Sequence, residues 1–238
     1  MSEFIDTTFI MSSDTPKGKD PDQHSPTLRK YHSLLWSKPL PSGESFNLEL
    51  DIPRLLHHKS SVGEFFLSSD CIGHTYRNTQ SLKNIIKNIS PNEIKSFLEV
   101  CGTIGGYIVF PSKKVNNKMT INGSRGCNYQ IKDRFDLTLK CIKLFYENKD
   151  SPLKSTFDRY ERFFKLFEDF KNYVDYFHLN PLVNKTYSEF NYFLPFKGFE
   201  YNPLPSNSEE YFSYKYKLTE FILSRNELIE NWTKRSLH

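Results

Sequence analysis

The stretch PLKSTFDRYERFFKLFEDFKNYVDYFHL (152–179) carries the strongest helical pattern in the chain. Its aromatic residues recur at spacings that place them on one broad side of a helix, namely Phe157, Tyr160, Phe163, Phe164, Phe167, Phe170, Tyr173 and Phe177. Because phenylalanine is a weak helix former, burial in a core rather than local propensity must hold such a helix. The stripe therefore predicts core packing and argues against a surface on which bases stack.

Further helical patterns lie on both sides of this stretch. One runs from about 129 to 147, and another runs from about 208 to 235, with Glu209 and Glu210 in its first turn, where the helix dipole favours acids. These patterns predict a mostly helical part over residues 126–238.

The N-terminal half has a different predicted secondary structure. Prolines recur in an arm over residues 10–44 that we expect to be ordered by packing, and residues 45–125 are predicted to be β-rich. Short helices are expected at 81–89 and 91–101, and strands at 46–50, 62–67, 103–111 and 119–123, the last two as a hairpin. The sequence thus predicts one α+β domain over 1–238, with a β-rich, loop-rich N-terminal half packed on a mostly helical C-terminal half.

Composition excludes several classes of protein. Aromatic residues make up 16% of the 238 residues, which is incompatible with disorder along the whole chain. The N-terminus lacks a basic, apolar secretory signal, and no run of 18 apolar residues occurs. The four cysteines form no C-x-x-C pair. We therefore expect a cytoplasmic protein that does not associate with a membrane.

Positive charge is concentrated in the middle of the chain. The net charge is +4, and residues 61–150 carry 13 basic against 8 acidic side chains. Such a surplus favours an anionic partner, such as a phosphate-bearing ligand or a nucleic acid. A solvated, lysine-rich face is the equally weighted alternative.

The segment INGSRGCNYQIKDRF (121–135) is the strongest candidate for binding that anion. Gly123 and Gly126 bracket an arginine between a predicted strand and a predicted helix start, which attracts anions. The alternative is that the glycines form ordinary turns and that Arg134 pairs with a carboxylate such as Asp136. The predicted ligand-binding residues of this segment are Asn122, Arg125, Asn128, Lys132 and Arg134.

The arm contributes the other candidates. We predict that Asp22 and His32 are catalytic and that Arg29 binds ligand, with all three folded over the cleft of Arg125. Arg125 and His32 are accordingly expected to border one pocket. The spacing of Asp20 and Asp22 fails the calcium-loop pattern, so turn formation is the favoured interpretation and no metal ligand is assigned. Nothing in the sequence indicates a cofactor or an oligomeric state.

Four segments together carry a resemblance to a known family. They are DTPKGKDPDQHSPTLRKYHSLLWSKPLPSG (14–43), VGEFFLSSD (62–70), TIGGYIVFP (103–111) and TINGSRGCNYQIKDRFDLTLKCIKLFY (120–146). From about Asp14 to Arg225 the chain resembles a bacterial family known only as a domain of unknown function. The resemblance implies that the first and last segments are the family's signature, in a bacterial and intracellular setting. It implies no catalytic role.

The sequence leads to two functional hypotheses. The first is an intracellular bacterial protein that binds a nucleotide or nucleic acid, with hydrolase or transferase chemistry as an extension, such as that of a toxin or phage-defence effector. The second is a non-enzymatic protein–protein interaction module, which the absence of any recognisable catalytic motif favours. Whether the chain is an enzyme stays open at this point.

Overall fold

A three-stranded antiparallel sheet lies at the centre of the structure, a computed structural model that describes residues 4–73 and 82–235. The strand order is β1-β2-β3, with β1 at Leu56–Ser60, β2 at Gly63–Cys71 and β3 at Tyr107–Pro111. Leu67 of the central strand pairs with Leu56 on one side and Pro111 on the other. Every residue of β3 is buried, which explains its apolar sequence.

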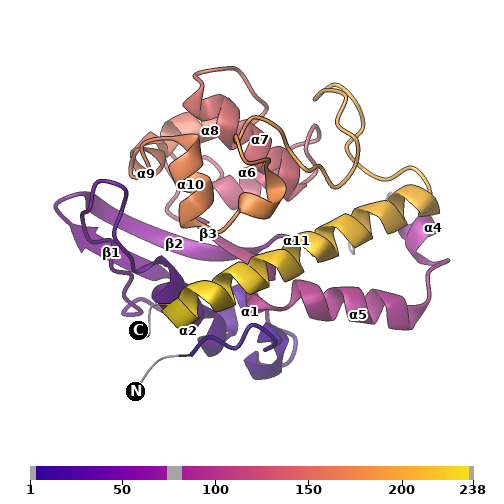
Figure 1. The fold of residues 1–238 in the computed structure, drawn as a ribbon, viewed down its shortest axis with the longest axis horizontal. Helices are drawn as coiled ribbons and strands as arrows, with labels where there is room; N and C mark the ends of the chain where they lie inside the picture. The colour runs from indigo at the N-terminus through magenta and orange to yellow at the C-terminus, as the bar shows by residue number, and fades with distance from the viewer. Residues whose placement is uncertain (1–3, 74–81, 236–238) are drawn as a thin grey trace.

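Helices surround the sheet on both sides in the view of Figure 1. Helices α6 to α10 lie above it in that view, and α2, α5 and α11 lie below it. The bounds are α1 Pro21–His24, α2 Pro26–Trp36, α4 Lys83–Ile86, α5 Pro91–Cys101, α6 Ile121–Cys127, α7 Phe135–Tyr146, α8 Lys154–Arg159, α9 Glu161–Lys165, α10 Phe170–Tyr176 and α11 Ser208–Arg235. The chain is therefore an α+β protein, as the sequence predicts.

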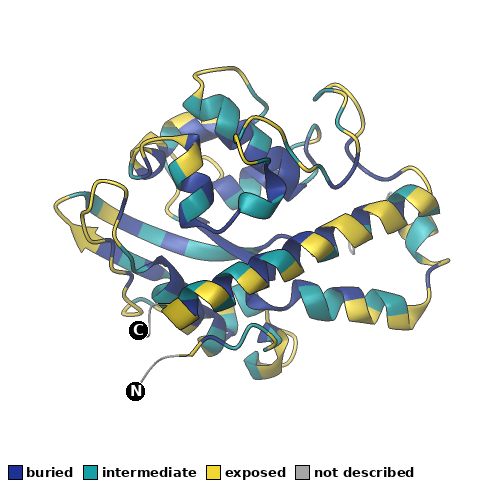
Figure 2. Cartoon of the chain, in the orientation of Figure 1, coloured by how far each residue is buried: buried dark blue, intermediate teal, exposed yellow. Residues whose placement is uncertain are grey.

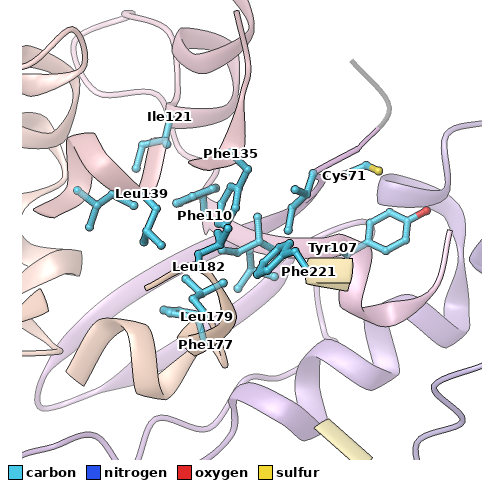
Figure 3. Close-up of a cluster of buried hydrophobic side chains, with 14 of the residues drawn as sticks. Cys71, Tyr107, Phe110, Ile121, Phe135, Leu139, Phe177, Leu179, Leu182 and Phe221 are labelled. Carbon is cyan, nitrogen blue, oxygen red and sulfur yellow. The ribbon is translucent and has the colours of Figure 1, made fainter. Parts of the chain in front are cut away.

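The buried hydrophobic residues form one cluster. Figure 3 shows Phe110, Phe135 and Phe221 gathered where β3, α7 and α11 meet, and the rings of Phe135 and Phe221 are stacked 6.2 Å apart. Figure 2 shows buried and exposed residues alternating along α11, as expected for an amphipathic helix that packs on one side. The aromatic stripe of 152–179 also belongs to this cluster, which confirms its predicted role in the core.

Helices with clear capping signals occur where the sequence places them. Ser90 caps α5 by accepting a hydrogen bond from the N–H of Glu93, and Pro91 occupies the first helical position. Ser25 and Pro26 begin α2 in the same way. Helix α11 has the predicted bounds, and the predicted helix at 81–89 is shortened to α4, with residue 81 outside the described part.

The predicted single helix at 152–179 is wrong, because the structure divides it into α8, α9 and α10. The backbone turns at Glu168, which has a φ of 64°, and Asp169 then caps α10. An unbroken helix of this length would extend about 40 Å and carry its rings away from one another. The breaks let rings of different helices pack together, as in the contact between Phe164 of α9 and Tyr173 of α10 at 5.8 Å.

The hairpin predicted between 103–111 and 119–123 is also wrong. Thr120 caps α6 by accepting from the N–H of Gly123, so the second segment is helical, and β3 pairs with β2 instead. Helix α7 starts at Phe135 rather than near 129, because Lys132 and Asp133 adopt positive φ values. Residues 46–50 contribute only the isolated bridge of Glu49 with His57.

Two broader expectations for the fold are also revised. The N-terminal half is not confirmed as β-rich, since α1, α2, α4 and α5 occur there beside the strands. Residues 190–205, whose sequence favours a strand followed by an extended loop, contribute only an isolated bridge between Phe190 and Val183. Within residues 4–73 and 82–235, no helix has both the length and the hydrophobicity needed to cross a bilayer.

Candidate functional site

A polar cleft of about 960 Å³ opens between the N-terminal arm, the end of β2, helix α5 and the turn before α7. Four aspartates from three separate segments line it: Asp20, Asp22, Asp70 and Asp133. The cleft is also lined by three exposed lysines, Lys17, Lys19 and Lys95. The topology thus brings acidic and basic side chains together at one opening.

Asp22 reaches the cleft because α1 is a single turn held against β2. The side chain of Asp20 caps this turn by accepting from the N–H of Asp22, and Pro21 fits the first helical position. Ser69 of β2 donates its hydroxyl to Asp22 Oδ1 at 3.1 Å. Burial raises the pKa of Asp22 well above 3.8, and the negative charges of Asp70 and Asp20 add to this effect.

A one-directional chain of hydrogen bonds lies behind Asp22. Trp36 Nε1 donates to His32 Nδ1 at 2.9 Å, and His32 Nε2 lies 3.0 Å from Ser69 Oγ. Because an indole nitrogen only donates, Nδ1 must be the acceptor, so the ring proton is on Nε2 and is donated to Ser69. Burial lowers the pKa of His32 to about 3, which keeps the ring neutral. His32 therefore positions Asp22 through Ser69.

Arg125 positions Asp70, as His32 positions Asp22 through Ser69. It is fully buried and forms ion pairs with Asp70 and, at 3.1 Å, with Asp133 Oδ1. Its Nε donates to Thr138 Oγ1 at 3.0 Å, and the ring of Phe135 lies 5.5 Å from its guanidinium. One arginine of α6 thereby ties the end of β2 to the turn before α7.

The pKa of Asp70 is raised from 3.8 to about 7. Burial is the largest cause, and it outweighs the attraction of Arg125, which acts in the opposite direction. The negative charges of Asp133 and Asp20 raise the pKa further. The carboxylates outnumber the one buried arginine, so the cluster retains a proton more readily than isolated aspartates do.

The other arginines predicted to bind a ligand contact the protein itself. Arg29 donates to the backbone carbonyls of Ile52 at 2.8 Å and Leu55 at 3.1 Å, so it anchors the loop before β1. Arg134 pairs with Asp136 and donates to the carbonyl of Pro203 at 3.0 Å. This pairing with Asp136 is the alternative that the sequence left open.

The predicted polar residues around Arg125 are also distributed over different contacts. Asn122 contacts β2, with its amide nitrogen 3.4 Å from Ser68 Oγ and 3.5 Å from the carbonyl oxygen of Ser69. Asn128 donates to the carbonyl of Pro152 at 3.2 Å, and Lys132 occupies a half-exposed position with a φ of 44°. Of the predicted set, Asp22 lines the cleft, and His32 and Arg125 lie behind its carboxylates.

The expectation that Arg125 and His32 border one pocket needs correction. Both side chains are buried and neither lines the cleft, because each is separated from it by the carboxylate that it holds in place. The glycines next to Arg125 form no open loop, since Gly123 and Gly126 lie within α6. Carboxylates of the protein occupy the places predicted for a ligand anion.

The sequence interpretation missed Asp70 and Asp133 as site residues. Asp70 did carry a signal, because it is an acid near the end of a strand that is otherwise largely apolar or small. Asp133 lies between Lys132 and Arg134 in the sequence, a context that gives no comparable signal. The position of Asp133 depends on a backbone φ of 62°, and no residue pattern in this segment predicts that conformation.

Comparison with known proteins identifies the family. The model of a family of unknown function, DUF6994, matches residues 5–229. This chain belongs to DUF6994. The DUF6994 match contains both polar segments and all four aspartates of the cleft, and it confirms the resemblance to a family of unknown function. No curated protein and no solved structure matches the chain significantly.

Proposed function

We propose that the chain binds a phosphate-bearing ligand, a nucleotide or a nucleic acid, in the aspartate-lined cleft and acts on it as a hydrolase or transferase. One observation carries the proposal. Asp22 and Asp70 converge on the cleft, and each is held from behind by a buried polar partner, His32 through Ser69 in one case and Arg125 in the other.

The energetics support a functional role for this arrangement. Burying an arginine with its carboxylates is often no more stabilising than packing apolar side chains of similar size. Solvent exposure of the carboxylates does not add stability to an ion pair that has only a structural role. The side chains of Asp70 and Asp133 nevertheless keep 22% and 15% of their surface exposed. Carboxylates with raised pKa values in a cleft are typical of sites that transfer protons or bind cations.

The residues that line the cleft favour a phosphate ligand that binds together with a divalent cation. Among the described residues, no group of three or more His, Cys, Asp or Glu side chains is arranged to hold a metal ion by itself. Mg²⁺ in phosphate-processing sites commonly uses one or two carboxylates and completes its shell with water and phosphate oxygens. Asp22 and Asp70 supply that pair, while Lys17 and Lys19 supply positive charge at the rim.

Calorimetric titration with ATP and with pyrophosphate, each with and without Mg²⁺, tests the proposal. We expect Mg²⁺-dependent binding that Asp22→Asn and Asp70→Asn weaken at least about tenfold, a loss of about 1.4 kcal/mol. Asp158→Asn is the matched control, because Asp158 is an exposed partner of Lys154 outside the cleft. Equal binding by all four proteins would refute the proposal for these ligands.

Salt dependence separates nucleic acids from small nucleotides. A nucleic-acid ligand predicts affinity that falls steeply with salt, with a log–log slope of about -0.9 per neutralised phosphate on duplex DNA and about -0.7 on single strands. Binding of an oligonucleotide that is absent at low salt, or indifferent to salt, would leave small ligands. A toxin or phage-defence role further predicts that expression in a bacterial host slows growth and that Asp70→Asn abolishes this effect.

The second candidate is a non-enzymatic interaction module, which one surface favours. Phe212 and Tyr216 of α11 are exposed beside a groove of about 710 Å³ between α5 and α11. If this groove is an interface between copies of the chain, Phe212→Ser and Tyr216→Ser will lower the sedimentation coefficient at high concentration. A lower sedimentation coefficient of these variants, together with a cleft that binds no phosphate ligand, would favour the non-enzymatic interaction module.

A further inference from the structure

Lys38, just after α2, extends its ammonium group into a cage of aromatic rings. Its Nζ lies 4.6 Å from the ring centre of Tyr176, 5.3 Å from that of Trp36 and 5.4 Å from that of Trp232. These rings come from α10, α2 and α11, so three distant segments build the cage. Lys38 and Trp232 are both partly exposed.

The polar neighbour of Lys38 is His178, whose Nε2 lies 3.4 Å from Nζ. Burial lowers the pKa of His178 to about 3, so the imidazole is neutral at ordinary pH and its Nε2 can accept a hydrogen bond. Within residues 4–73 and 82–235, Lys38 forms no ion pair with an Asp or Glu. Lys38 thus lacks the carboxylate partner that normally keeps a partly buried lysine charged.

Other charged groups around the cage act on Lys38 from α10 and α11. Arg225 of α11 is buried, has its guanidinium 5.8 Å from the ring centre of Trp36, and disfavours the ammonium form. Asp175 of α10 favours it, but this carboxylate is already engaged by Lys171, Tyr187 and Asn180. The balance of these groups leaves the amine less protonated than an ordinary lysine.

From this cluster we propose that Lys38 is a covalent attachment site for small, uncharged aldehydes, separate from the aspartate cleft. The apolar rings favour an uncharged, planar electrophile over a phosphorylated one. They also favour a product that keeps its positive charge, because aromatic faces attract cations. A protonated imine meets both requirements.

The electrostatics provide a reactive amine at neutral pH. Burial, followed by the charge of Arg225, lowers the pKa of Lys38 from 10.5 to about 7. The aromatic rings act in the opposite direction on the ammonium form. A substantial fraction of the side chain is nevertheless a free amine at pH 7, whereas an ordinary lysine with a pKa of about 10.4 is almost fully protonated.

The reaction balances with the groups present. The Nζ lone pair of the neutral amine attacks the carbonyl carbon, and the electrons of the C=O π bond move to oxygen, which takes up a proton from water. His178 Nε2 accepts a hydrogen bond from Nζ and so orients the amine, while water removes a proton from the attacking nitrogen and a solvent proton is delivered to the hydroxyl of the carbinolamine. Loss of that hydroxyl as water forms the C=N bond, so no oxidant or reductant is required.

The test is benzaldehyde labelling trapped with cyanoborohydride, with each lysine followed by peptide mass spectrometry. At pH 7 we expect Lys38 to be labelled at least about tenfold faster than Lys59, an exposed lysine of β1, with a rate that levels off above about pH 7. His178→Gln is expected to slow labelling of Lys38 severalfold while leaving Lys59 unchanged.

Two outcomes would overturn the inference. One is a Lys38 rate no greater than that of Lys59, and the other is a rate that keeps rising tenfold per pH unit to pH 9, as for an ordinary lysine. Asp70→Asn serves as the control for the cleft and should leave labelling unchanged. The result is therefore independent of whether the cleft binds phosphate.

Discussion

Arg125 and Asp70 form a buried ion pair across 55 residues of sequence. The pair joins α6 to the end of the central strand, and Asp133 extends it to the turn before α7. It therefore links the two parts of the chain that form the cleft. Its effect on stability and its effect on ligand binding are separable by substitution.

Replacing Arg125 with alanine is expected to lower the free energy of unfolding by about 3–5 kcal/mol, because it leaves Asp70 and Asp133 without their buried partner. Denaturant titration measures the change. Lys165→Ala is the control, since Lys165 forms only an exposed pair with Glu161, and its effect should stay within about 0.5 kcal/mol. An unchanged midpoint for Arg125→Ala would contradict the structural role.

Gly126→Ala is expected to stabilise the protein by about 0.5–1 kcal/mol. Gly126 lies in α6, and a Cβ added there meets nothing within 4 Å. Gly106→Ala is the opposite case, because its Cβ would lie 2.1 Å from the backbone oxygen of Cys101. Thermal unfolding of both variants measures the contrast. Destabilisation by Gly126→Ala would favour the open anion-binding loop instead.

The aromatic stripe is expected to behave as core. Phe163→Ala and Phe167→Ala should each lower the free energy of unfolding by about 3–5 kcal/mol, since both rings are almost wholly buried. Phe212→Ala is the matched control, because that ring is exposed on α11. A small loss of stability combined with loss of nucleic-acid binding would identify the stripe as a stacking surface.

Asp22→Asn is expected to stabilise the chain more as the pH rises above about 4. The pKa of Asp22 is raised in the folded state, so the folded chain retains a proton that the unfolded chain releases near 3.8. The associated stability is complete below that pH and is lost as the pH rises through the folded-state pKa.

The measurement is the difference in unfolding free energy between wild type and Asp22→Asn from pH 4 to pH 8. His32 and His178 have pKa values lowered to about 3 and impose the opposite slope, but they are present in both proteins and cancel. A difference that does not change with pH would show that Asp22 ionises like an isolated carboxylate.

Sequence reasoning worked where a local signal decided the structure. Ser90 with Pro91 marks the start of α5, and the charges at both ends of 208–235 mark α11, because caps and helix dipoles act within one turn. The aromatic stripe likewise identified core residues from their spacing. The family resemblance also came from sequence alone and was confirmed.

Local signals were insufficient where long-range packing determined the backbone. The pattern of 152–179 has no proline or glycine after Pro152, yet the chain turns at Glu168 so that rings of successive helices, such as Phe164 and Tyr173, meet. In the same way, Thr120 starts a helix where residue types favoured a strand. Burial of aromatic area outweighs the propensity of a few residues.

The sequence by itself determined the α+β class, the helices α5 and α11, the aromatic core and the polar segments that supply Asp22, His32 and Arg125. Only the tertiary structure decided their roles. A buried arginine needs polar partners, and the carboxylate that Arg125 finds, Asp70, is brought to it by strand pairing rather than by proximity in sequence. That pairing turns a predicted anion-binding arginine into the support of an acidic cleft.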